Sequence, residues 1–111
     1  MAKYARLSGN NRLTVRQVEV VLESLVESEN QFYYDKNNER NVLDNAALRL
    51  HTSIPANGKT KYAFLGRGNR MTQVQLHNLT WFLEGIIQSY RKSKPQVHRV
   101  LFNALVILKD G

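Results

Sequence analysis

Two four-residue stretches, Asn-Arg-Leu-Thr at residues 11–14 and Asn-Arg-Met-Thr at residues 69–72, each precede a segment with helical periodicity. The apolar residues that follow correspond at the same offset of 58, since Val18 matches Leu76 and Val21 matches Leu79. Any helix that needs an N-cap and a buried face imposes this pattern, and we interpret the likeness in this way. The alternative is an ancient duplication whose two halves pack about a pseudo-twofold axis.

Each stretch predicts where a helix begins. Thr14 with Gln17, and Thr72 with Gln75, have the spacing of a capping box, in which each side chain hydrogen-bonds the backbone of the other residue. The first helix should bury a face made of Val18, Val21, Leu22, Leu25 and Val26. The long helix from Thr72 should bury Leu76, Leu79, Phe82, Leu83, Ile86 and Tyr90.

Two more helices are expected, one over about residues 40–50 and one that ends near Lys109. The first of these has apolar residues at the helical spacing, namely Leu43, Ala46, Ala47 and Leu50. In the last helix, Ser93 and Pro95 mark the start, and the core face is Val97, Val100, Leu101, Ala104, Leu105 and Leu108. Phe102, Val106 and Ile107 widen its apolar surface beyond one stripe, which predicts a homodimer through helix 97–108.

The segment between the second and third helices predicts a β-hairpin. Residues 51–54 and 59–65 are compatible with strands, and Asn57-Gly58 between them is a strong signal for a tight hairpin turn. The expected fold class is therefore mostly α (α+β), with about four helices and one hairpin. We expect a single domain over residues 1–111, of which residues 1–13 form a polar N-terminal arm.

Several functional classes are disfavoured by composition. The chain has no cysteine, so it has no disulfide and no thiolate nucleophile, and a reducing cytoplasm suits it. The N-terminus has no signal-peptide core, and the longest apolar stretch, residues 100–108, contains Asn103 and is too short to span a bilayer. We expect a cytoplasmic protein with no membrane partner.

The sequence also offers little for catalysis or cofactor binding. Residues 53–60 end like a phosphate-binding loop, but Pro55 removes an amide that such a loop needs. His51, His77 and His98 do not have metal-ligand spacing, and no serine has an evident His and Asp arrangement. We expect no enzymatic activity, no cofactor and no metal site.

Charge is distributed unevenly along the chain, whose net charge is +7. Residues 1–45 contain six Lys/Arg and seven Asp/Glu, whereas residues 46–109 contain ten Lys/Arg and only Glu84 as an acid. This asymmetry predicts one basic face directed at a polyanion. The plainer alternative is that the charge only maintains solubility.

The best functional candidate is the segment 57–70, in which cations alternate with aromatic residues and glycines. Its cations can contact phosphates and Tyr62 could stack on a base, while Phe64 and Leu65 are expected to anchor the segment in the core. A second basic cluster at 91–99 would extend the same surface. The candidate nucleic-acid-binding residues are Lys59, Lys61, Tyr62, Arg67, Arg70, Arg91, Lys92, Lys94 and Arg99.

The function expected from the sequence is non-catalytic nucleic-acid binding, with DNA preferred to RNA only on general frequency. The alternative is a protein-interaction module, either an inhibitor or an assembly subunit, whose basic face docks on an acidic partner protein.

Overall fold

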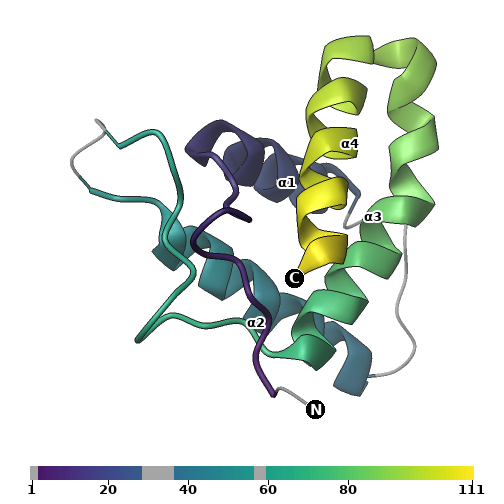
Figure 1. Ribbon diagram of the computed structural model, residues 1–111. Coiled ribbons are helices and arrows are strands. Elements are labelled where there is room, and N and C mark those ends of the chain that lie inside the picture. The colour runs from purple at the N-terminus through teal and green to yellow at the C-terminus, as the bar shows by residue number, and fades with distance from the viewer. Residues whose placement is uncertain (1–2, 29–36, 57–59) are drawn as a thin grey trace.

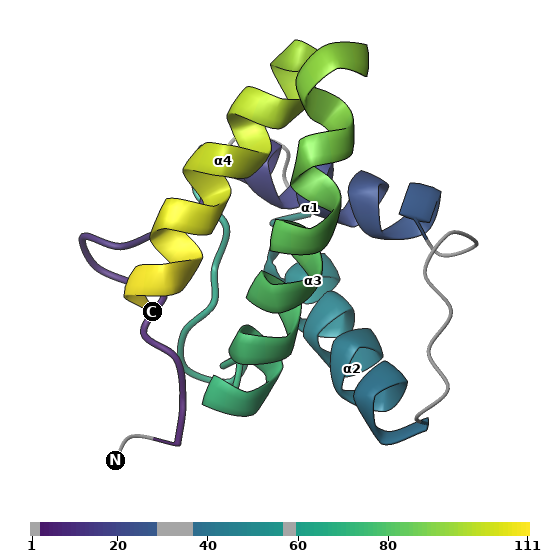
Figure 2. The same ribbon diagram turned by 90° about the vertical axis from the view of Figure 1, so that its right-hand side faces the viewer.

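The computed structural model describes residues 3–28, 37–56 and 60–111, and those residues form four helices (Figure 1). The helices are α1 (Val15–Ser28), α2 (Asn37–Ser53), α3 (Gln73–Ser93) and α4 (Pro95–Asp110). α3 and α4 lie antiparallel and side by side, while α1 packs on α4 and α2 packs on α3 (Figures 1 and 2). The expectation of a mostly helical fold with four helices is confirmed.

Both capping boxes are present. The Gln17 amide donates to Thr14 Oγ1 at 3.1 Å, and the Thr14 amide donates to Gln17 Oε1 at 2.8 Å. Thr72 and Gln75 repeat this geometry at 3.1 and 2.9 Å. These pairs satisfy amides that the first turn of a helix leaves without a partner, which is why α1 and α3 begin where they do.

The expected start of α4 is wrong in detail. Ser93 does not cap it, because the Ser93 hydroxyl donates to the Ser89 carbonyl inside α3. α4 begins instead with Lys94 at the cap position and Pro95 in the first turn, where a missing N–H costs nothing.

The core lies between the helices and contains most of the expected residues. All six residues expected on the buried face of α3 are buried. In α1 the expectation fails at Val26, which is 69% exposed, while Val20 and Ser24 are buried. The buried face of α1 is therefore rotated towards Val20. The reason is that α1 contacts both α4 and α2, and one row of apolar residues cannot face both helices.

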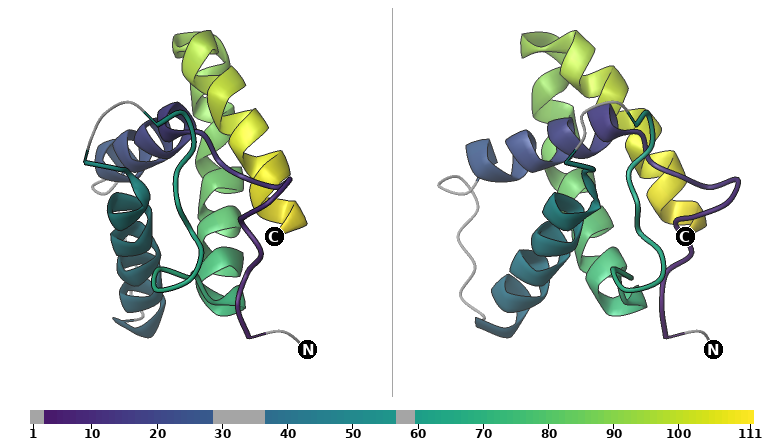
Figure 3. Two further views of the ribbon diagram at one scale, coloured as in Figure 1. Left: turned by 60° about the vertical axis from the view of Figure 1, so that its left-hand side comes forward. Right: turned by 90° about the vertical axis from the view of Figure 1, so that its left-hand side faces the viewer.

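Two extended segments, residues 3–14 and residues 60–72, lie on the same side of the molecule (Figure 3). They meet through three isolated antiparallel bridges, which join Tyr4 to Thr72, Leu7 to Leu65, and Thr14 to Tyr62. Each segment therefore pairs with the other segment and not with residues close to it in the sequence. We call them the extended segments.

The hairpin expected between α2 and α3 is not confirmed. Residues 51–53 form the last turn of α2, whose buried side continues through Leu50 and Ser53. Residues 62–65 pair with the N-terminal extended segment, and the Phe64 amide donates to the Ser53 carbonyl at 2.8 Å. The proposed turn at 57–58 lies outside the described residues.

The N-terminal segment, which we expected to form a polar arm, also contributes residues to the core. Ala5, Leu7 and Leu13 are almost completely buried, which alternation along an extended chain allows while the residues between them stay polar.

The contacts between the segments obey a rule with an offset of 58. Tyr4 corresponds to Tyr62 and Thr72 corresponds to Thr14 at this offset, so the Tyr4–Thr72 bridge is equivalent to the Tyr62–Thr14 bridge. The Leu7–Leu65 bridge is equivalent to itself, because its two residues are 58 positions apart. The backbone hydrogen bonds are equivalent in the same way. The Ala5 amide donates to the Met71 carbonyl at 2.8 Å, and the equivalent Ala63 amide donates to the Leu13 carbonyl at 2.9 Å. The Gln73 amide donates to the Lys3 carbonyl and the equivalent Val15 amide to the Lys61 carbonyl, both at 2.9 Å. Reciprocal exchange of contacts defines a twofold relation.

The duplication extends over both helices of each half. Lys-Tyr-Ala occurs at residues 3–5 and again at 61–63, and Val-Leu occurs at 42–43 and at 100–101, each time with Asn-Ala two residues later. Each half thus consists of an extended segment, a tight turn and two helices. Capping and burial do not require identical residues outside the helix starts, and the reciprocal contacts follow the same offset, so a duplication accounts for the likeness better than capping and burial alone.

Asn11 and Asn69 hold the extended segments at equivalent positions. Asn69 Nδ2 donates to the Phe64 carbonyl at 3.1 Å and to the Arg49 carbonyl in α2 at 3.0 Å. Asn11 Nδ2 donates in the same way to Arg6 at 3.1 Å and to Ile107 in α4 at 3.0 Å. Each side chain therefore joins the extended segment of one half to the second helix of the other half.

We expect Asn69→Ala to lower the free energy of unfolding by about 1–3 kcal/mol, because Asn69 is buried and two carbonyls lose their partner. Asn11→Ala should cost less, since Asn11 is only partly buried and water can replace its amide. Urea denaturation measures both, with the exposed Asn103→Ala as a control that changes stability little. Equal and negligible losses at 11 and 69 would contradict the role assigned to them.

Candidate nucleic-acid interface

The extended segments carry a group of exposed cations, which we call the cationic face: Lys3, Arg6, Arg12, Lys61, Arg67 and Arg70. Residues 1–18 and 45–83 contain no Asp or Glu. Within the part of the chain that the structure describes, the ion pairs join Lys94 to Glu27 and Lys109 to Glu84, and neither pair includes the cationic face. The positive charge of this face is therefore not neutralised by neighbours in sequence or by ion pairs among the described residues.

Four of these cations are arranged around two tyrosines. The Arg70 guanidinium lies 4.4 Å from the centre of the Tyr4 ring, and Lys3 Nζ lies 5.5 Å from it. Around Tyr62, the Arg12 guanidinium lies at 4.1 Å and Lys61 Nζ at 5.5 Å. Each ring attracts its cations through the negative charge of its face and so limits the directions that the long side chains sample.

A shallow hollow of about 360 Å³ opens between the extended segments. Its lining includes the four cations Lys3, Arg6, Arg67 and Arg70, together with Ser8 and the backbone at Gly66. The hollow is open to solvent and four of its lining side chains are cationic, which suits an anionic ligand that keeps part of its hydration better than a buried apolar one.

The structure brings together only some of the residues expected from the sequence. Lys61, Tyr62, Arg67 and Arg70 belong to the second extended segment, whereas Lys59 lies outside the described residues. Leu65 anchors the segment as expected.

Phe64 does not anchor the segment. It is 56% exposed, because Ala63 and Leu65 take the inward positions and successive side chains of an extended chain point to opposite sides. Its ring lies against Gly66, where an added Cβ would come within 3.1 Å of it.

The second expected cluster is far from the first. Arg70 precedes α3 and Arg91 lies in its last turn, so the length of α3, about 30 Å, separates them. Lys92 also lies in the last turn of α3, Lys94 lies between α3 and α4, and Arg99 lies in α4 near its start. Figure 1 shows this end of the two helices. The expectation that both clusters extend one surface is therefore wrong, because sequence spacing does not show in which direction α3 runs.

Lys94 is also engaged elsewhere. It forms an ion pair with Glu27 at 3.2 Å, and the Tyr90 hydroxyl donates to the same carboxylate at 2.9 Å. The Tyr90 hydrogen bond, and then Lys94, hold the pKa of Glu27 below its usual value. This end of the molecule therefore has less free positive charge than its lysines and arginines suggest.

The cationic face also contains Lys3, Arg6 and Arg12 and has Tyr4 beside them, and local sequence patterns do not predict these residues for the site. The net charge of −1 over residues 1–45 hid them, since seven acids between Glu19 and Asp44 outweigh the cations of the first segment. The repeated Lys-Tyr-Ala at an offset of 58 was the signal that could have identified them.

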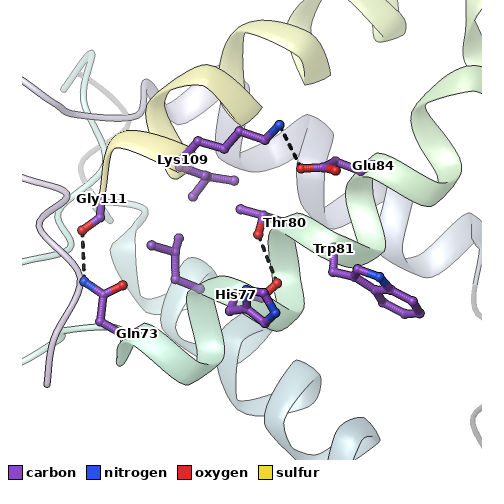
Figure 4. Close-up of a pocket in the computed structure, with 9 residues that line it drawn as sticks. Gln73, His77, Thr80, Trp81, Glu84, Lys109 and Gly111 are labelled. Carbon is purple, nitrogen blue, oxygen red and sulfur yellow. Dashed lines mark hydrogen bonds and ion pairs between the residues drawn. The ribbon is translucent and has the colours of Figure 1, made fainter.

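A second hollow, of about 350 Å³, lies between α3 and the end of α4 (Figure 4). Four of its lining residues pair with one another: Lys109 pairs with Glu84 at 2.9 Å, and Gln73 Nε2 donates to the Gly111 carbonyl at 3.1 Å. Trp81 lies at its edge and is 65% exposed. Because the charges are already paired within the hollow, its polar groups are less available to an external ligand than those of the cationic face.

Among the described residues, no group of His, Asp and Glu has the geometry of a metal site, and no helix is long and apolar enough to cross a membrane. The fold and the site together define an internally duplicated helical domain with a basic face on its paired extended segments. Comparisons with protein-family models, curated proteins and solved structures find no match to this chain.

Proposed function

We propose that this protein binds nucleic acid in the cytoplasm without catalysing a reaction, and that the cationic face makes the contacts. The observation that carries the proposal is the gathering of six exposed Lys and Arg side chains on two segments that contain no carboxylate. The chain supplies these cations from positions as far apart as Lys3 and Arg70, which only the pairing of the extended segments brings together.

The chemistry of these residues suits a phosphate backbone. Lys and Arg neutralise phosphates and release condensed counterions, which supplies most of the affinity of sequence-independent binding. Arginine also donates two parallel hydrogen bonds to a phosphate. The tyrosine rings hold Arg12 and Arg70 in place, so that less side-chain entropy is lost when they bind.

Replacing Lys61, Arg67 and Arg70 together with Ala should weaken nucleic-acid binding. The slope of log affinity against log salt should fall by about 2–3, since each lost phosphate contact lowers it by about 0.7–0.9. Fluorescence anisotropy with a labelled oligonucleotide over a range of salt concentrations measures this slope.

The matched control is the triple variant Arg91→Ala/Lys92→Ala/Arg99→Ala, which removes the same charge from the end of α3 and the beginning of α4. Its slope should stay close to that of the parent. If both variants, melting like the parent, lower the slope equally, the interface is not confined to the cationic face. If the parent binds no nucleic acid at low salt, an acidic partner protein is the better ligand class.

We also propose that the protein forms a homodimer through α4. Phe102 and Val106 are one helical turn apart and are 56% and 50% exposed, while His98 stacks on Phe102 with 6.5 Å between ring centres. Two apolar side chains on one exposed face favour burial against a second copy.

Sedimentation at high micromolar concentration should therefore show a dimer, and Val106→Glu should shift it towards the monomer because a carboxylate would be buried without a partner. Leu48→Glu is the control, since Leu48 is the equivalent exposed residue of α2 at 60% exposure. A parent protein that sediments as a monomer would exclude this interface.

A further inference from the structure

We propose that the cationic face binds double-stranded DNA with the pseudo-twofold axis of the chain on a dyad axis of the duplex, so that one chain contacts the DNA as a symmetric dimer would. This inference rests on the proposed function and specifies its ligand.

The axis passes out of the molecule through the cationic face. Directly opposed residues of an antiparallel pair point to the same side, and both Leu7 and Leu65 are buried. The axis through this pair therefore runs from the core to the outer side of the extended segments. The clusters around Tyr4 and Tyr62 flank the axis as equivalents, because each position of one corresponds to a position of the other at the offset of 58.

A duplex has the symmetry that this arrangement needs. Its two strands run in opposite directions and are related by twofold axes perpendicular to the helix, which is why twofold-symmetric proteins meet inverted half-sites. A single strand has a direction and no such axis, so it would meet the two clusters in opposite orientations and its contacts with them would not be equivalent.

The tyrosines also favour a duplex. A single strand is held mainly by stacking of its bases on aromatic rings. Here the guanidinium groups of Arg12 and Arg70 lie over Tyr62 and Tyr4, at 4.1 and 4.4 Å from the ring centres. A base that stacked on the same ring face would have to displace a cation that the phosphates need.

The antiparallel pairing of the extended segments suits B-form DNA. Its major groove admits a two-stranded ribbon, whereas the deep and narrow major groove of RNA duplexes does not. Near the centre of the pair, the exposed residues that precede the buried leucines are Arg6 in one half and Phe64 in the other. The two half-sites would therefore meet different side chains at the centre, whereas the cations around Tyr4 and Tyr62 are equivalent.

The test compares pairs of variants that the axis makes equivalent. Lys3→Ala/Arg70→Ala removes the cations around Tyr4, and Arg12→Ala/Lys61→Ala removes those around Tyr62. On a duplex DNA of about two helical turns, each pair should lower the salt slope by the same amount, about 2, since B-DNA gives about 0.9 per phosphate contact. The parent should bind this duplex about tenfold or more tightly than either of its single strands or the RNA duplex of the same sequence at equal salt.

Single substitutions cover the case in which a double variant does not fold. Lys3→Gln and Lys61→Gln change the equivalent outer cations, which lie 5.5 Å from their rings, and each should lower the slope by about 1. Unequal effects of the two clusters, or single strands or duplex RNA bound as tightly as duplex DNA, would overturn the duplex inference while leaving nucleic-acid binding in place. Failure of the parent to bind any of these probes would instead overturn the proposed function.

Discussion

The structure depends on the exchange of backbone hydrogen bonds between its two extended segments. An extended stretch cannot satisfy its own N–H and C=O groups, and burying it without partners would be costly. Each segment finds its partners in the opposite half, at Leu7–Leu65 on the axis and at the residues before each helix on either side. The Arg6 amide donates to the Gly111 carbonyl at the end of α4, as the Phe64 amide does to Ser53 at the end of α2. Neither half could keep this arrangement alone.

The same exchange explains why two ordinary helix pairs make one domain. α1 packs on α4 and α2 on α3, so each interface between the halves joins a first helix to a second helix. The buried positions follow the repeat, as at Val18 and Leu76 or at Leu50 and Leu108, because both copies face the same environment. Packing density leaves little freedom at such positions.

At the surface the two halves differ in chemistry while they keep their backbone. Arg16 of α1 corresponds to the exposed Val74 of α3, and Glu23 corresponds to Trp81, which is 65% exposed. The cation pairs around Tyr4 and Tyr62 are the same in both halves. A surface that needed only charge for solubility would not require this particular equivalence of side chains. This equivalence is the observation from which we propose a ligand with twofold symmetry for the cationic face.

The sequence by itself determined the helices. Thr14 and Thr72, the glutamines three residues later and the periodic apolar residues are local signals, and the structure contains the helices they predict. It also indicated that Lys61, Arg67 and Arg70 belong to a basic segment. Only the tertiary structure decided that Lys3, Arg6 and Arg12 join them and that Arg91 does not, since the pairing of residues 3–14 with 60–72 and the direction of α3 are long-range properties. Local periodicity and spacing cannot encode which distant segment satisfies an extended backbone, because several segments offer the same hydrogen-bonding groups and burial in the folded chain selects one of them.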